Sequence, residues 1–177
     1  MVVHTLGFST RDLEGLLALV RPAGIALVAD IRLVPRSRHT PQWNREALEA
    51  SLPARGLAYR HLRALGGFRR PRPDSPHLGW RHPSFRGYAD YMDTPAFTAA
   101  LAELLALAAA TPLAIACTEA VPWRCHRSLV ADALTVRGVE VYHLVTPGLP
   151  PARHALPPFA RVGPGLRLAY PAAGAAG

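Results

Sequence analysis

Residues 25–35 read Ile-Ala-Leu-Val-Ala-Asp-Ile-Arg-Leu-Val-Pro. A short apolar run closed by an acidic and a basic residue is typical of a strand buried on both faces of a parallel sheet, so we predict a strand over 25–31. Further strands are predicted at residues 2–6, 57–62, 113–116 and 139–144.

Helical patterns separate these strands. A helix capped by Ser9 or Thr10 is expected to end at 22–24, and others are predicted at 44–52, 94–110 and 125–136, with a helical turn at 88–92. The alternation predicts an α/β fold with a mostly parallel sheet flanked by helices on both faces, in Rossmann-like or flavodoxin-like layering. We expect one domain over 1–177, with an irregular Arg/Pro/Gly-rich excursion at about 63–87 and a Pro-rich tail at 147–177 that ends in an edge strand, 166–170.

The composition is that of a globular protein. The 177 residues are 50% apolar and 18% charged, and no apolar run reaches the roughly 18 residues of a membrane span. No secretory signal is evident, and two Cys eight positions apart suit a reducing compartment. We therefore expect a cytoplasmic protein that has no membrane association and requires no obligate protein partner.

The basic residues are all Arg, and their distribution is uneven. Residues 32–86 hold 12 of the 20 Arg and three of the 12 acidic residues, which gives this segment a net charge of +9 against +8 for the whole chain. Such a local excess of guanidinium groups, interleaved with aromatic residues, favours DNA or another phosphate-rich partner. The absence of Lys excludes a phosphate-loop Lys, a Lys Schiff base and a Lys general base.

The segment 117–127, Cys-Thr-Glu-Ala-Val-Pro-Trp-Arg-Cys-His-Arg, runs from a predicted strand end into a helix N-terminus, where ligands gather in parallel α/β folds. The candidate catalytic residues in this segment are Cys117, Glu119 and His126, and the candidates for binding substrate or phosphate are Cys125 and Arg127. Zinc could use Cys117, Cys125 and His126, but adjacent Cys-His residues do not easily share one tetrahedral ion, so we predict neither a metal nor another cofactor. A lone Cys after a strand is also commonly just buried.

A second cluster follows the strand at 25–31. Asp30 is a candidate general base or a carboxylate that stabilises a cationic sugar, although an ion pair with Arg32 or Arg38 would explain it equally well. Further candidates for substrate or phosphate contact are Ser9, Arg32, Ser37, Arg38, Asn44 and Tyr88. Tyr88 alternatively packs the following helix onto the sheet, and His143 is expected to be a hydrogen-bonded core or edge histidine.

The chain resembles a bacterial and archaeal family, domain of unknown function 488. The resemblance lies in 5–9 (Thr-Leu-Gly-Phe-Ser), in the 30–38 loop, in Gln-Trp-Asn at 42–44, in 59–67, in Phe-Arg-Gly-Tyr at 85–88, and in Cys-x-Glu at 117–119 with Cys-His-Arg at 125–127. The family often has His where this chain has Phe8. The resemblance implies a compact α/β protein and a connection with DNA base repair or modification.

Three functions follow from these residues. The first is a monofunctional DNA N-glycosylase that removes a damaged or modified pyrimidine, such as 5-hydroxymethyluracil or uracil, in base excision repair. In it Asp30 or Glu119 directs water while Asn44 reads a base edge. The second is a Cys-thiolate-dependent hydrolase or transferase acting on a phosphorylated substrate, with Cys117 or Cys125 as nucleophile. The third is a non-catalytic nucleic-acid-binding module.

Overall fold

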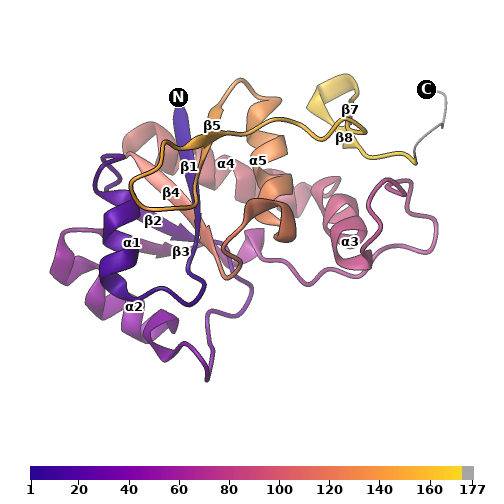
Figure 1. Cartoon of the computed structure of the whole chain (residues 1–177). Helices are drawn as coiled ribbons and strands as arrows, with labels where there is room; N and C mark the ends of the chain where they lie inside the picture. The colour runs from indigo at the N-terminus through magenta and orange to yellow at the C-terminus, as the bar shows by residue number, and fades with distance from the viewer. Residues whose placement is uncertain (173–177) are drawn as a thin grey trace.

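A six-stranded sheet forms the centre of the fold in the computed structural model, which describes residues 1–172 (Figure 1). The strand order is β3-β2-β4-β1-β5-β6. The first five strands are parallel, and β6 pairs with β5 in the antiparallel sense. Their bounds are β1 Val2–Gly7, β2 Leu27–Asp30, β3 Ala58–His61, β4 Leu113–Cys117, β5 Glu140–Leu144 and β6 Ala152–Arg153.

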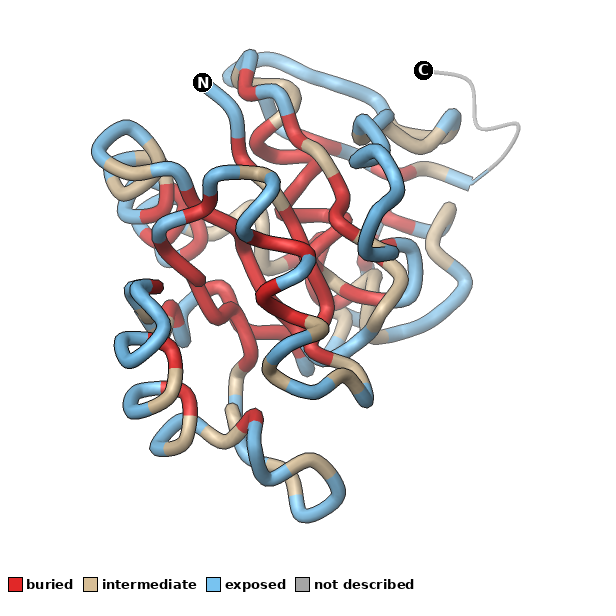
Figure 2. The backbone as a smooth tube through the Cα atoms, turned by 60° about the vertical axis from the view of Figure 1, so that its left-hand side comes forward, coloured by how far each residue is buried: buried red, intermediate tan, exposed pale blue. Residues whose placement is uncertain are grey.

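Helices cover both faces of this sheet, which confirms the predicted fold class. Helices α1 (Leu13–Val20) and α2 (Arg45–Ser51) pack on one face, whereas α3 (Pro83–Met92), α4 (Pro95–Ala110) and α5 (Arg127–Thr135) pack on the other. Side chains of β4 alternate between the two cores: Leu113 and Ile115 face α4 and α5, while Ala114 and Ala116 face α1 and α2. Figure 2 shows the buried residues gathered at the centre of the molecule, and β2 and β4 are buried along their whole length.

The start of α1 differs from the predicted start. Its N-cap is Asp12, whose carboxylate accepts a hydrogen bond from the Gly15 amide at 2.8 Å, rather than Ser9 or Thr10. The Phe8 and Ser9 amides instead donate to the carbonyls of Cys117, the last residue of β4, and of Thr118, so the chain continues alongside β4 before it can turn. Local cap preference was therefore overridden by strand pairing.

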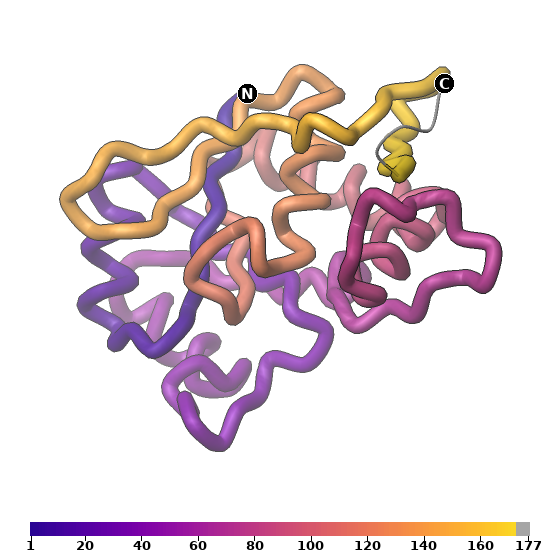
Figure 3. The backbone as a smooth tube through the Cα atoms, turned by 45° about the vertical axis from the view of Figure 1, so that its right-hand side comes forward, coloured from indigo at the N-terminus to yellow at the C-terminus, as the bar shows by residue number. Residues whose placement is uncertain are grey.

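The excursion and the tail also depart from the prediction. Helix α3 begins at Pro83 with His82 as its N-cap, five residues before the predicted helical turn at Tyr88. The terminal strand β8 (Leu168–Ala169) pairs with β7 (Arg161–Val162) in a separate ribbon, and the edge strands of the main sheet are β3 and β6. Figure 3 shows the tail running to the excursion, where the Gly79 amide donates to the Tyr170 carbonyl.

The sheet topology positions the functional site. The chain leaves β1 and β2 across the α1–α2 face, but it leaves the intervening β4 through α5 on the opposite face. This divergence opens a crevice beside the carboxyl end of β4, the usual place for a ligand in an open α/β sheet. No single helix among residues 1–172 is long and apolar enough to cross a membrane; α3 and α4 reach that length and composition only as a pair bent by 81°.

Candidate functional site

A cavity of about 450 Å³ lies at the carboxyl ends of β2 and β4. Its wall comes from the ends of these strands, from the segments that follow them as far as the N-cap of α5, and from two parts of the excursion. The size falls within the ~300–1,000 Å³ usual for small-molecule sites. Its lining residues are 32–34, 67–68, 82, 84–85, 117–119 and 123–126.

Two thiols and an imidazole meet in the cavity wall. Nδ1 of His126 lies 3.9 Å from Sγ of Cys117 and 3.7 Å from Sγ of Cys125, although Cys117 ends β4 and the other two residues precede α5. Nε2 of His126 is 3.2 Å from the Ile31 carbonyl oxygen, which can only accept, so Nε2 carries a hydrogen. In the neutral imidazole, the Nδ1 lone pair therefore faces both sulfur atoms.

The neighbours of the two thiols drive their pKa values apart. A hydrogen bond from Cys117, together with His126 and the guanidinium of Arg127, holds the pKa of Cys125 well below its ordinary value. The pKa of Cys117 is raised well above its ordinary value, because it donates to Cys125 and is buried. Cys125 is thus the more acidic of the two thiols.

Glu119 brings an exposed carboxylate to the cavity wall on a tightly held backbone. It takes part in no ion pair within residues 1–172. The buried Arg127 donates to the carbonyls of Glu119 and Ala120 at 2.5 and 2.9 Å. A Cβ at Gly7 would lie only 1.9 Å from the Glu119 carbonyl oxygen, so this close approach requires glycine. The guanidinium of Arg127, for which the sequence predicted a phosphate contact, therefore holds the Glu119 loop in position.

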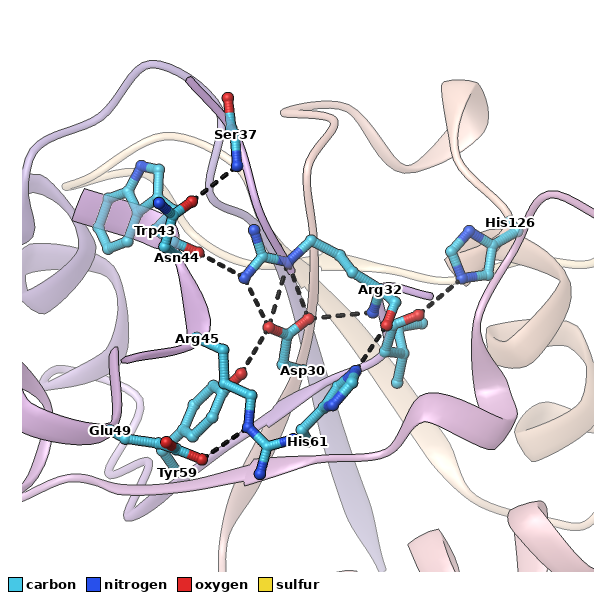
Figure 4. Close-up of polar contacts among 11 residues, drawn as sticks. Asp30, Arg32, Ser37, Trp43, Asn44, Arg45, Glu49, Tyr59, His61 and His126 are labelled. Carbon is cyan, nitrogen blue, oxygen red and sulfur yellow. Dashed lines mark hydrogen bonds and ion pairs between the residues drawn. The ribbon is translucent and has the colours of Figure 1, made fainter. Parts of the chain in front are cut away.

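Asp30 lies in a buried ion pair (Figure 4). Its Oδ2 accepts from Nη2 of Arg32 at 2.6 Å and from the Tyr59 hydroxyl at 2.8 Å, while Oδ1 accepts from the Arg32 amide and Nε. Arg32 also donates to the Trp43 carbonyl and lies 4.5 Å from the Phe8 ring centroid. Asp30 is fully buried and does not line the cavity, which matches the structural alternative of an Asp30–Arg32 pair.

Several other predicted contacts shape loops or the core. Oδ1 of Asn44 accepts from the Ser37 amide at 2.6 Å, and the Tyr88 hydroxyl donates to the Leu65 carbonyl while its ring packs 4.9 Å from that of His126. The cavity is lined by the predicted residues Arg32, Cys117, Glu119, Cys125 and His126. It is not lined by Ser9, Asp30, Ser37, Arg38, Asn44, Tyr88 or Arg127.

Two aromatic residues of the cavity wall were not singled out as site residues from the sequence. Phe68 and Trp123 have 85% and 68% of their surface exposed. Phe68 also has φ of 58°, a left-handed conformation that costs a bulky residue energy and is often retained where function uses it. The Gly-Gly-Phe-Arg-Arg sequence at 66–70 was the available signal, because exposed aromatics beside Arg are typical of nucleic-acid contacts.

A second polar network lies away from this cavity. Asp132 accepts from the Tyr170 hydroxyl at 2.7 Å and contacts His154 at 2.7 Å, and a further chain joins His154 to His143 at 2.9 Å and His143 to Thr5 at 2.8 Å. Burial raises the pKa of Asp132, whereas burial and the neighbouring His154 lower the pKa of His143 to about 4. The prediction that His143 is a hydrogen-bonded core histidine is confirmed.

Residues 12–134, more than half of the chain, match the family described as domain of unknown function DUF488. The chain belongs to this family. The DUF488 region contains every cavity-lining residue, together with β2, β3 and β4. No curated protein and no solved structure matches the chain. The family description names no activity.

Proposed function

We propose that this DUF488 protein is a monofunctional DNA N-glycosylase that removes a damaged or modified pyrimidine, such as 5-hydroxymethyluracil or uracil, in base excision repair. The observation that carries the proposal is the Glu119 carboxylate, which has no ion-pair partner within residues 1–172, in the wall of a cavity that also bears two exposed aromatic rings. A carboxylate and stacking surfaces in one cavity are what an enzyme needs to hydrolyse a flipped nucleotide.

Phe68 and Trp123 are the residues that we assign to base stacking. An aromatic ring left largely exposed at a cavity has apolar area to bury against a ligand, and every base offers a flat face to it. Stacking of one base on an aromatic side chain contributes about 1–3 kcal/mol. Such stacking offsets part of the energy needed to take the base out of the duplex.

Arginines beside the cavity-lining segments supply the phosphate contacts. Several Arg residues lie in the cavity-lining segments or within four positions of them, and these Arg residues have no carboxylate partner within residues 1–172. The segments concerned are 32–34, 67–68, 82–85 and 123–126. Exposed guanidinium groups attract the DNA backbone whatever its sequence. The exposed members of this set are Arg36, Arg38, Arg63, Arg70, Arg81 and Arg124.

Glu119 is assigned the chemistry. As the bond from C1′ to the base nitrogen breaks, its electron pair leaves with the base and positive charge builds on the sugar, which the carboxylate stabilises. A water oxygen bonds to C1′ and gives its proton to Glu119, and the proton then passes to the departing base. Because the chain has no Lys to form a Schiff base, the product is an intact abasic strand.

The test uses end-labelled single- and double-stranded oligonucleotides that carry one uracil, 5-hydroxymethyluracil, hypoxanthine or oxidised base. We expect a modified pyrimidine to be released and the strand to break only after alkali. Glu119→Gln should lower the rate by about 100-fold or more, the usual contribution of acid–base catalysis. The matched control Glu46→Gln removes an exposed carboxylate on α2, away from the cavity, and should keep the wild-type rate.

Two results would overturn the glycosylase proposal. One is the absence of an alkali-labile product from every substrate, which, with retained salt-sensitive binding, would indicate a binding module. The other is an undiminished rate of product formation by Glu119→Gln.

A further inference from the structure

The ligating atoms of Cys117, Cys125 and His126 all lie within 4.8 Å of one another. In a tetrahedral zinc site, metal–sulfur and metal–nitrogen bonds of about 2.3 and 2.0 Å place a sulfur and a nitrogen ligand about 3.5 Å apart. The two sulfur-to-Nδ1 distances here are 3.9 and 3.7 Å. Both sulfur-to-nitrogen distances therefore need to shorten by only a few tenths of an ångström to match those around one ion.

The local backbone explains how adjacent residues can share an ion. Cys125 is extended, with φ −138° and ψ 143°, and the next residue, His126, is already helical, with φ −55° and ψ −17°. This change of direction brings both side chains to the same point, where β4 delivers Cys117. The objection that the sequence raised against adjacent Cys-His ligands does not hold for this conformation.

The surroundings of the three residues are those of a metal site. The Ile31 carbonyl holds the Nε2 hydrogen of His126 at 3.2 Å, and a backbone carbonyl in this role commonly fixes the tautomer of a metal-bound histidine. The Arg127 amide donates to Sγ of Cys125 at 3.5 Å, which favours a thiolate. A Cβ at Gly67 would lie 2.8 Å from Nδ1 of His126, so only glycine leaves this nitrogen accessible.

We propose that Cys117, Cys125 and His126 bind a transition-metal ion of the zinc class, with its fourth coordination position open to the cavity. Two thiolates and an imidazole select zinc-like ions over magnesium or calcium. All three ligands line the cavity, and three protein ligands with one open position are typical of catalytic rather than structural zinc. The metal site stands independently of the glycosylase proposal, because none of its evidence involves DNA.

The test measures metal rather than activity. The full chain, purified without a histidine tag and kept reduced, is stripped with a chelator, dialysed and titrated with Zn²⁺ and Co²⁺. We expect one tightly bound ion per chain. Bound Co²⁺ should give sulfur-to-cobalt charge-transfer absorption and the strong visible bands of a tetrahedral site. Failure of the reduced wild-type protein to bind either ion would overturn the proposal, as would a cobalt spectrum without sulfur ligation.

Variants identify the ligands. Cys117→Ser and Cys125→Ser should each lose much of the sulfur-to-cobalt absorption, and His126→Ala should weaken binding, whereas the exposed His39→Ala should bind as wild type does. Circular dichroism checks that each variant is folded. Where a Cys variant does not fold, zinc protection of the wild-type thiols against iodoacetamide gives the same information. Unchanged cobalt spectra in the folded variants, or equal alkylation with and without zinc, would overturn the assignment.

Discussion

Replacement of Asp30 by Ala distinguishes a structural carboxylate from a catalytic one. Asp30 is fully buried, and its partner Arg32 is only 6% exposed. Removing one member of a buried pair leaves the other charge without compensation, which costs about 3–5 kcal/mol. The Tyr59 hydroxyl also loses its acceptor. Against a typical total stability of about 5–15 kcal/mol, this loss should be large enough to lower the Tm by roughly 6–20 °C.

The assay is urea unfolding followed by circular dichroism. The control Glu49→Ala breaks the Arg45–Glu49 pair on α2, whose side chains are 51% and 46% exposed, and should change stability by less than about 1 kcal/mol. The double variant Asp30→Leu/Arg32→Met removes both charges, so it should be more stable than Asp30→Ala. A loss below about 1 kcal/mol in Asp30→Ala, equal to the control, would refute the structural role.

Three further predictions concern stability. Gly7→Ala should destabilise the fold severely in thermal unfolding, because its Cβ would lie 1.9 Å from the backbone oxygen of Glu119; an unchanged Tm would contradict this. His143 is buried and its pKa is lowered to about 4. As the pH falls, this histidine therefore binds a proton in the unfolded chain before it does so in the folded protein. The free energy of unfolding should be highest above pH 6.5 and fall by up to about 3 kcal/mol as the pH approaches 4. Its dependence on pH should be weaker in His143→Gln. Tyr170→Phe should lose about 1–3 kcal/mol in urea unfolding, since Asp132 loses a buried donor; a loss within error would count against that bond.

The strands and the layering were predictable because they depend on local apolar patterns. The run at 25–31 contains β2, and the Ala/Leu-rich stretch at 94–110 is α4, with Thr94 as the predicted N-cap. Boundaries failed where tertiary contacts override local preference. The backbone pairing that follows β1 moves the N-cap of α1 to Asp12, and the N-cap His82 makes α3 begin at Pro83.

The candidate site was predictable where it follows strand ends. Cys117, Glu119 and His126 could be placed together because all three lie in the one segment that runs from a predicted strand end into a helix N-terminus. The partner of Asp30 could not be chosen between Arg32 and Arg38, because that depends on how the loop folds back. The exposure of Phe68 was not predictable, since residues 66–82 contain many Gly and Pro and have no periodicity.

Mass spectrometry of an intact oligonucleotide tests most directly the proposal that Glu119 hydrolyses an N-glycosidic bond. A strand carrying one modified pyrimidine is incubated separately with wild-type protein and with the Glu119→Gln variant. The masses of the strand and of the released base are then measured. We predict that the wild type converts the strand to the mass of an abasic site with the free base in equal amount, and that the variant leaves it unchanged. Unaltered strand masses for every modified base with the wild-type protein would contradict the account.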